Sequence, residues 1–411
     1  MKKDETGDCS IPVNIGGLNF KNPFFVASGP ATKSARQLKK IEETGWAAAS
    51  IKLSIDPAPY INNKPRYGYF KEYNALGFTA EKRLTFSEGL NLVEEAKKTL
   101  TELRLFANIT YAGDGGVRGW VNMAKQFENS GADVIEINMC CPNMSFNVEV
   151  TSGKTATQKT GASLGQQPEL IAEIVREMKK SVRIPVFVKL TPEGGRIAET
   201  AAVLYEAGAD AVGGTGNRLG IPPVNIGNPA QSVYELQEEI SMSCFSGAWL
   251  KPLALRDTYE IRKHNGPKPF IMATGGICKW QDAAEMILCG ANLTGICTAV
   301  LLNGYDIVRP MINGLKSWMD SHNYKSIDDF RGNLIPEIKT AAELTIHDGY
   351  AEVTAKSCAE KCGLCEKTCI SFAPEYIGPD TIKINRDLCT GCGICTARCP
   401  KKNIRMIKMK K

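Results

Sequence analysis

Long apolar runs are missing from this chain of 411 residues. Nowhere do about 18 apolar residues follow one another, which is the length that a membrane-spanning helix requires. The first residues, Met1 to Ser10, are polar and lack the apolar centre of a secretion signal. We therefore expect no signal peptide, no membrane association and a cytoplasmic location.

The chain also lacks a large excess of charge of either sign. It has 50 Lys and Arg residues and 44 Asp and Glu residues, which give a formal net charge of +6. No basic run is interleaved with aromatic residues, so we expect no nucleic-acid binding. The basic tail from Lys401 to Lys411 is typical of a solvated terminus. The glycine-rich stretch Gly113 to Gly119 lacks the G-x-G-x-x-G spacing after a strand, so the sequence predicts no Rossmann unit and no nicotinamide site.

Cysteine, in contrast, is abundant: the chain has 15, and eight lie between Cys358 and Cys399. In a reducing compartment these residues are metal ligands, catalytic groups or buried thiols rather than disulfides. The run Cys389-x2-Cys392-x2-Cys395-x3-Cys399-Pro400 is the bacterial ferredoxin pattern, in which three thiolates bind one [4Fe–4S] cluster and the fourth reaches the other cluster.

A second quartet precedes this run and differs from it in two places. Its first gap holds one extra residue, and Ile370 stands where proline is usual. We expect two [4Fe–4S] clusters, although the longer gap leaves open whether Cys358 is a ligand. Zinc is the alternative, but zinc favours two separated cysteine pairs. The expected ligand sets are Cys358, Cys362, Cys365 and Cys399 for one cluster, and Cys369, Cys389, Cys392 and Cys395 for the other.

Eight apolar segments rich in small residues alternate with segments of helical periodicity through the first 300 or so residues. A hairpin around Gly16-Gly17, within Ile11 to Pro23, precedes them. This order predicts an α/β fold, a (β/α)8 TIM barrel rather than an open doubly wound sheet. The expected strands are Phe24–Ser28, Ala47–Leu53, Leu105–Thr110, Val134–Met139, Val186–Leu190, Ala211–Thr215, Phe270–Ala273 and Leu293–Ala299.

The loops that follow barrel strands build the active site of this fold. Two lysines, Lys52 and Lys189, end strands and suit an anionic or electron-rich ring. Gly275-Gly276 and the small residues after the last strand fit a phosphate site made of backbone N–H groups. The fourth strand runs into Asn138-Met139-Cys140-Cys141-Pro142-Asn143, where thiols can move a proton and amides can grip a planar polar ligand.

These ordered motifs resemble the FMN barrel of dihydroorotate and dihydropyrimidine dehydrogenases. The resemblance runs from about Val13 to Gly332, and the iron–sulfur tail is similar to that of the dihydropyrimidine dehydrogenase branch. The motifs that carry it are Ala27-Ser28-Gly29-Pro30, Lys52, Pro65-Arg66, Asn138…Cys141-Pro142, Gly165-Gln166…Pro168-Glu169-Leu170, Lys189-Leu190-Thr191-Pro192, Ser246-Gly247…Lys251-Pro252, Ala273-Thr274-Gly275-Gly276-Ile277 and Cys297-Thr298-Ala299.

The resemblance implies FMN, reversible reduction of the 5,6 C=C bond of uracil or thymine, and Cys141 as the catalytic acid. It implies substrate contacts from Asn74 and Asn138, to which we add Asn143 and Asn217. The implied flavin contacts are Ala27, Ser28, Lys52, Lys189, Ser246, Gly247, Gly275, Gly276, Thr298 and Ala299, to which Asn108, Asn138 and Thr215 are added as residues near strand ends.

The pair Gly216-Asn217 departs from the family, which has Asn-Thr at this place. We expect Gly216 to let the backbone turn so that Asn217 recovers the lost contact. Dihydroorotate or another unsaturated ring or enone stays open as the substrate, and an electron-transfer module without turnover is the alternative of another class. A separate NAD(P)H reductase subunit or a ferredoxin is the expected electron partner, and an oligomer is expected.

The same motifs predict the division of the chain. The barrel is expected over residues 1–332, a linker over 333–354, and a small α+β ferredoxin-like domain over 355–411.

Overall fold

The computed structural model describes residues 10–58, 62–79, 81–142, 160–354, 362–378 and 381–409. The predicted site residues Asn143 and Cys358 lie outside the described residues. The chain divides into two compact units, Met1–Glu337 and Ile338–Lys411. Among the helices of the described part, none combines the length and the apolar character needed to span a bilayer.

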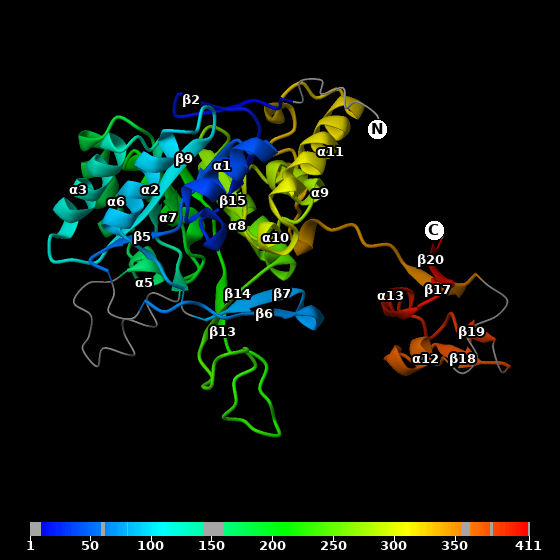
Figure 1. Cartoon of the computed structure of the whole chain (residues 1–411). Helices are drawn as coiled ribbons and strands as arrows, with labels where there is room; N and C mark the ends of the chain where they lie inside the picture. Colours follow the sequence, from blue (N-terminus) through cyan, green and yellow to red (C-terminus); the bar gives the residue numbers. More distant parts are fainter. Residues whose placement is uncertain are drawn as a thin grey trace, which may run out of the picture. The chain divides into compact units, whose positions relative to one another are not determined.

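Eight parallel strands of the larger unit close into a barrel, which confirms the predicted fold (Figure 1). Each predicted strand is present, although six of the eight are shorter than expected. The last one ends at Ile296, because α10 (Thr298–Asn303) follows. In barrel order the strands are β3 (Phe24–Val26), β4 (Ala48–Ser50), β9 (Arg104–Tyr111), β10 (Val134–Asn138), β11 (Val186–Lys189), β12 (Ala211–Gly213), β15 (Phe270–Thr274) and β16 (Leu293–Ile296), which pairs again with β3.

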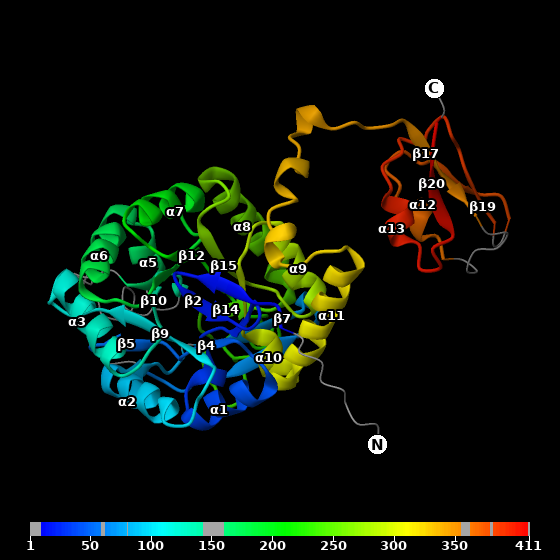
Figure 2. The ribbon, with the colours of Figure 1, turned by 90° about the horizontal axis from the view of Figure 1, so that it is seen from above.

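Helices surround the barrel as an outer ring, which Figure 2 shows in a view along the barrel. In α6 (Pro168–Ser181), Ile171, Ile174, Val175 and Met178 are buried, so the predicted periodicity marks the face toward the strands. Other helices of this ring are α1 (Ala35–Thr44), α2 (Phe86–Lys97), α3 (Gly116–Asn129), α7 (Ile197–Glu206), α8 (Lys251–Asn265), α9 (Trp280–Leu288) and α11 (Val308–Ser321). The short helix α5 (Gly161–Gly165) lies inside the ring, where Gly165 packs against the chain that follows β10 and β11.

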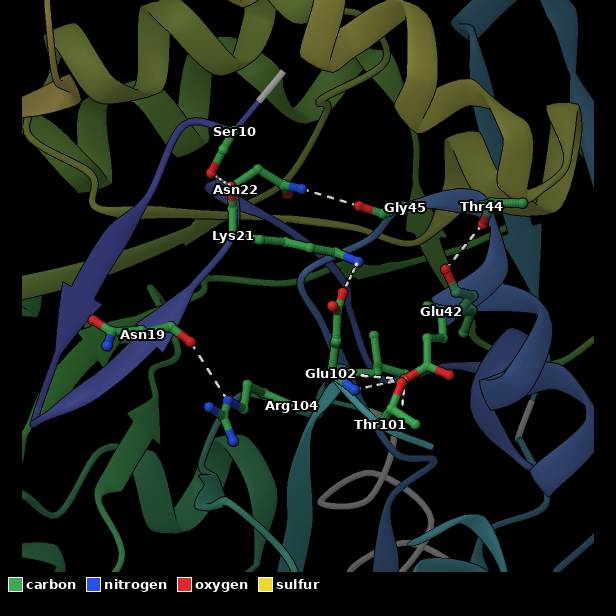
Figure 3. Close-up of polar contacts among 12 residues, drawn as sticks. Ser10, Asn19, Lys21, Asn22, Glu42, Thr44, Gly45, Thr101, Glu102 and Arg104 are labelled. Atoms are coloured by element: carbon green, nitrogen blue, oxygen red, sulfur yellow. Dashed lines mark hydrogen bonds and ion pairs between the residues drawn. The ribbon is translucent and has the colours of Figure 1, made fainter. Parts of the chain in front are cut away.

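The predicted hairpin is confirmed as β1 (Val13–Ile15) and β2 (Leu18–Phe20), an antiparallel pair that lies across one end of the barrel (Figure 2). Its Phe20 is buried and meets Phe106 of β9 edge to face at 6.0 Å. Polar contacts hold the hairpin in place (Figure 3): Asn22 Nδ2 donates to Gly45 O at 2.9 Å, and Lys21 pairs with Glu102 at 3.2 Å. The hairpin therefore closes the end of the barrel where the strands begin.

A four-stranded antiparallel sheet lies at the opposite end of the barrel (Figure 1). Tyr234, from the segment between its strands β13 and β14, is buried and meets Phe70 edge to face at 6.0 Å. No sequence pattern indicated this sheet, because it joins short strands from two distant segments. Its order is β13 (Arg218–Gly220), β14 (Ser243–Ser246), β7 (Ala75–Phe78) and β6 (Tyr67–Phe70), and two further short strands, β5 (Ser54–Asp56) and β8 (Leu84–Thr85), extend the barrel sheet beside β9.

The smaller unit has the predicted α+β ferredoxin-like architecture. Its core is small and includes Ala351, Ala373, Ile382 and Ile404. Residues 349–353, expected in the linker, form a strand of this unit. The elements are β17 (Gly349–Val353) paired with β20 (Ile404–Lys408), β18 (Pro374–Tyr376) paired with β19 (Ile382–Ile384), and the helices α12 (Leu364–Thr368) and α13 (Ile394–Arg398).

Glu42, near the end of α1, binds the segment that leads into β9 (Figure 3). Its Oε1 accepts the N–H groups of Thr101, Glu102 and Leu103 at 2.7, 2.8 and 3.1 Å, and its Oε2 accepts from Lys39 at 2.8 Å. Burial by itself raises the pKa of Glu42, but these hydrogen bonds outweigh it and lower the pKa to about 2.

We predict that Glu42→Gln lowers the free energy of unfolding of the larger unit by roughly 2 kcal/mol at neutral pH. Because the folded pKa lies below the ordinary value of 4.5, this stabilisation is lost as pH falls from 4.5 to about 2. Urea unfolding followed by tryptophan fluorescence checks this, since all five Trp lie in the larger unit. Exposed Glu43 is the control, and an equal loss in Glu43→Gln would contradict the assignment.

Candidate active site and cluster cavities

A cavity lies where the barrel strands end, between those ends and the four-stranded sheet. The chain after β3, β4, β10, β11, β12, β15 and β16 contributes to its wall, as the barrel fold requires of an active site. The predicted residues that line it are Ala27, Ser28, Lys52, Asn138, Cys141, Lys189, Asn217, Ser246, Gly247, Gly275, Gly276 and Thr298.

Four predicted residues do not line the cavity. Asn74 is exposed at the turn between β6 and β7, with a φ of 50°, and its Oδ1 accepts from Tyr69 Oη at 2.9 Å. Asn108 is fully buried behind the wall, and Ala299 is buried in α10. Thr215 is also buried, and its carbonyl accepts from Thr274 Oγ1 at 2.9 Å. These residues hold the frame of the site or lie beside it.

Two glycines after β15 form a stretch of bare backbone in the cavity wall. Gly275 and Gly276 have φ values of 119° and 74°, a region that other residues rarely adopt. A Cβ on Gly276 would lie 2.4 Å from Lys251 N, so no side chain fits here. Their predicted role, a backbone surface that an anionic group can approach closely, agrees with this geometry.

Lys189, at the end of β11, is a buried cation with 8% exposure that also lines the cavity. Within the described part of the chain its side-chain amine has neither an ion pair nor a hydrogen bond. Burial lowers the pKa of Lys189, but nearby acidic groups, Glu136 among them, outweigh burial, so the pKa lies above its ordinary value and the amine stays charged. A buried ammonium is costly unless an acceptor binds it. If Lys189 binds a flavin, as predicted, an atom of the flavin would be that acceptor.

Lys52 differs, because its amine already pairs with a carboxylate, that of Glu81. Tyr67 Oη of β6 donates to the other oxygen of Glu81 at 3.0 Å. Burial raises the pKa of Glu81, but the charge and hydrogen bond of Lys52 outweigh it, so the pKa lies below its ordinary value. Glu81 is therefore ionised, and the pair connects the barrel wall to the sheet above it.

A buried polar chain orients Asn138 at the end of β10. Glu136, with 1% exposure, accepts from Ser50 Oγ at 2.5 Å and from Asn108 Nδ2. Asn108 Oδ1 then accepts from Asn138 Nδ2 at 3.0 Å, and Asn138 Oδ1 accepts the N–H of Cys140 at 3.2 Å. One N–H of the Asn138 amide therefore remains for a ligand in the cavity.

The two adjacent thiols lie in different surroundings. Cys140 is buried, with Sγ 3.6 Å from Asn138 Oδ1, and burial raises its pKa to about 11. Cys141 is partly exposed to the cavity, packs against Leu53 and Ile55, and has Sγ 4.0 Å from Arg83 Nη2. The position of Cys141 suits proton exchange with a ligand, whereas Cys140 acts as a neutral donor to Asn138.

The Gly216-Asn217 pair reaches the cavity, but not through an unusual glycine conformation. Gly213 and Gly214 make the turn, with φ values of 123° and 67°, whereas Gly216 has no positive φ. The expected reason for glycine at position 216 is therefore wrong. A Cβ there would lie 3.5 Å from Cys140 Sγ, so a longer side chain would compete with the Cys140 thiol for space.

Two further cavities lie in the smaller unit, and each gathers cysteines from both quartets. One is lined by Cys362, Cys365 and Cys399, and the other by Cys369, Cys389, Cys392 and Cys395. These sets agree with the predicted exchange of the fourth ligand between clusters. The described residues hold no group of three His, Cys, Asp or Glu side chains that converges on a single ion.

The cysteine segments are a structural repeat with an offset of 30 residues. Gly363 and Gly393, each just before a five-residue helix, have φ values of 56° and 80°. Phe372 and Lys402, three residues after the last cysteine of each segment, have φ values of 55° and 53°. The repeat supports an equivalent role for the first quartet despite its irregular gap.

Sequence reasoning missed Glu81, Arg83, Glu136 and the ion pair of Arg218 with Asp257. A lone carboxylate within the apolar strand Val134–Asn138 could have identified Glu136, because buried charges are rare unless paired. Glu81 and Arg83 follow an apolar strand, but nothing local indicates that they turn into the cavity.

The closed barrel, its glycine backbone and its strand-end amides and thiols define a (β/α)8 oxidoreductase with an appended ferredoxin-like unit. The chain belongs to the dihydroorotate dehydrogenase family: the family pattern described as "Dihydroorotate dehydrogenase" matches residues 10–319. The pattern described as "4Fe-4S binding domain" matches residues 382–405. Membership implies a flavin, and the second match implies an iron–sulfur cluster.

Curated relatives cover most of the chain. The NAD-dependent dihydropyrimidine dehydrogenase subunit PreA of Escherichia coli is 26% identical over 95% of this chain and 85% of its own length. The chloroplastic dihydropyrimidine dehydrogenase (NADP(+)) of Arabidopsis thaliana is 26% identical over 86% and 83%. The dihydroorotate dehydrogenase B (NAD(+)) catalytic subunit of Thermoplasma volcanium is 29% identical over 78% and 97%. The chain is an oxidoreductase of the class that acts on CH–CH bonds.

The contrast between the two thiols leads to a prediction. Cys141→Ala should reduce turnover by a factor of about 10² to 10⁴, the usual contribution of a positioned acid or base, with flavin and iron retained. Cys140→Ala, which removes only the thiol donor to Asn138, should be mild. Steady-state kinetics with flavin and iron analysis check this. Reversed results would move the catalytic role to Cys140.

Proposed function

We propose that this enzyme reversibly reduces the 5,6 C=C bond of uracil or thymine, with electrons passing between FMN and a redox partner through two [4Fe–4S] clusters. The observation that carries the proposal is the arrangement around one cavity of Asn138, Cys141 and Lys189. The two relatives named dihydropyrimidine dehydrogenases, which match most of the chain, support this substrate class.

The cavity wall fits FMN. Gly275 and Gly276 offer close backbone approach to its phosphate, and buried Lys189 offers a positive charge to the isoalloxazine ring. Ala27, Ser28 and Thr298 line the same wall. Bound there, FMN would supply or accept the hydride and would exchange single electrons with iron–sulfur clusters.

Asn138 and Asn217 suit the two amide edges of a pyrimidine. The Asn138 amide, fixed through Asn108, presents one N–H, and Asn217, after β12, lines the same cavity. During reduction the Cys141 thiol gives its proton to one carbon of the double bond as the other carbon receives the hydride. In the oxidative direction the thiolate takes that proton back.

The smaller unit suits two clusters. We assign Cys358, Cys362, Cys365 and Cys399 to one cluster, and Cys369, Cys389, Cys392 and Cys395 to the other. The two cavities support these sets, apart from Cys358, which lies outside the described residues. The Asn403 N–H lies 3.2 Å from Cys399 Sγ and the Ala351 N–H lies 3.4 Å from Cys389 Sγ, contacts that stabilise thiolates.

A separate protein is needed as the source of electrons, because the sequence offers no nicotinamide site. The relative in Escherichia coli is itself named a subunit of an NAD-dependent enzyme. We infer a reductase subunit or a ferredoxin as partner for this chain, in an oligomer.

Dihydroorotate is the second candidate substrate, and Arg83 favours it. This residue has 4% exposure, lines the cavity beside Cys141, and makes no ion pair within the described part of the chain. Its main chain is held by Asn62, which accepts from Arg83 N at 2.7 Å. A buried guanidinium in this position would pair with a ring carboxylate.

The cofactor content is the first prediction of the proposal. Protein purified under anaerobic conditions should carry one FMN and about eight iron atoms per chain, the number that two [4Fe–4S] clusters require. Metal analysis and extraction of the flavin check this. Zinc, or about four iron atoms, would contradict the assignment of the first quartet.

The second prediction of the proposal concerns the substrate. With a reduced dye as electron donor, uracil and thymine should be reduced, whereas NADH or NADPH alone should support no turnover. Asn217→Ala should lower kcat/KM by roughly tenfold or more while FMN stays bound, because an unmatched polar group costs about 1–3 kcal/mol. If the pyrimidines and their dihydro forms neither react nor perturb the flavin spectrum, dihydroorotate becomes the leading candidate.

A further inference from the structure

Asn217 lines the cavity as a polar residue whose side chain makes no hydrogen bond within the described part of the chain. It lies in the short connection between β12 and β13, after the glycine turn at Gly213-Gly214. Such a connection can move, yet substrate recognition requires the Asn217 amide to stay in one place. A second structural element must therefore fix this segment.

Arg218, directly after Asn217, is in contact with that segment. Its Nη1 donates to Gly216 O at 2.8 Å, and its Nη2 lies 3.4 Å from Asp257 Oδ2. The Arg218 side chain is 19% exposed and that of Asp257, on α8, is 1% exposed. A planar guanidinium that binds a carbonyl with one nitrogen and a buried carboxylate with another fixes the distance between them.

The bond to Gly216 O fixes the peptide group between Gly216 and Asn217. In a trans peptide the C=O and the following N–H point in opposite directions. When Gly216 O is turned toward Arg218, the N–H of Asn217 is therefore turned away from Arg218. The carbonyl one residue earlier is also held, because Thr274 Oγ1 of β15 donates to Thr215 O at 2.9 Å.

We propose that the Arg218–Asp257 pair is a positioning device for substrate recognition, which holds the Gly216–Asn217 peptide so that Asn217 meets the substrate. The inference rests on the proposed function for the identity of the substrate. The contacts by which Arg218 holds the Gly216–Asn217 peptide do not depend on that identity. Arg218 and Asp257 act through Asn217 and do not react.

Arg256 provides a matched control. It binds the same Asp257 carboxylate, with Nη2 2.7 Å from Oδ1, but its side chain is 54% exposed. Among the described residues, the Arg256 side chain makes no hydrogen bond or ion pair with the Gly216–Asn217 segment. A general loss of charge pairing at Asp257 would affect both arginines. Loss of loop positioning would follow only from a change at Arg218.

The first measurement needs no substrate. Gly216 lies beside Cys140 at the cavity, since a Cβ on Gly216 would be 3.5 Å from Cys140 Sγ, and Cys140 is 5% exposed. We expect Arg218→Gln to raise the rate of Cys140 alkylation by iodoacetamide at least about fivefold, as local opening exposes the thiol, and Arg256→Gln to leave it unchanged. Fragmentation of the labelled peptide by tandem mass spectrometry distinguishes Cys140 from the adjacent Cys141, and Tm is recorded for each variant.

The second measurement is kinetic, with uracil and a reduced dye. Arg218→Gln should raise KM about tenfold with a much smaller change in kcat, and Arg218→Lys should recover part of the loss. Arg218→Gln in an Asn217→Ala background should add little, because both changes remove the same contact.

Unchanged Cys140 alkylation in Arg218→Gln, or an equal increase in Arg256→Gln, would overturn the proposal. Additive KM effects of Arg218→Gln and Asn217→Ala would also overturn it. If wild-type protein does not act on uracil or thymine, the proposed substrate fails, while the alkylation contrast still decides the role of Arg218.

Discussion

Pairing of β16 with β3 closes the barrel, and the rest of the site depends on this closure. In register, Thr294 faces Phe24 and Ile296 faces Val26, so the last strand of the barrel meets the first. Parallel strands in a closed sheet all end at one rim, which brings Ser28, Lys52, Asn138, Lys189 and Thr298 around one cavity although up to 270 residues separate them. Hydrophobic burial stabilises that closure, and Phe106 in its interior contacts Phe20, Phe25 and Phe187.

Two buried ionisable residues, Glu136 and Lys189, determine which polar groups the barrel wall presents to the cavity. Glu136 is buried within the wall, where Ser50 and Asn108 satisfy its carboxylate, and this chain of hydrogen bonds determines which atom of Asn138 faces the ligand. Lys189 lies in the same wall without a partner among the described residues, which leaves its charge for a bound group. The wall therefore combines a carboxylate whose hydrogen bonds are satisfied with an ammonium whose charge is directed to the cavity.

In the smaller unit, a repeated segment brings the cysteines together, whereas in the larger unit closure of the barrel brings the site residues together. Its two cysteine segments share glycines and residues of positive φ at equivalent places, and each cavity takes cysteines from both segments. Its hydrophobic core is small. Domains of this size commonly need metal groups for stability, so a bound iron–sulfur cluster would contribute to the folding of this unit.

The sequence alone determined the order of the barrel strands, the ferredoxin spacing and most of the cavity residues. Strand ends, glycine pairs and cysteine spacing are local patterns, and the barrel places every strand end at one rim. Tertiary structure decided what depends on distant segments meeting. It added the four-stranded sheet built from residues 67–78 and 218–246, and it paired Glu81 with Lys52. It also placed Asn74 outside the cavity. Gly216, which the sequence suggested as a turn residue, instead lies beside Cys140. No local pattern encodes these contacts, because each depends on which side chain occupies the space opposite.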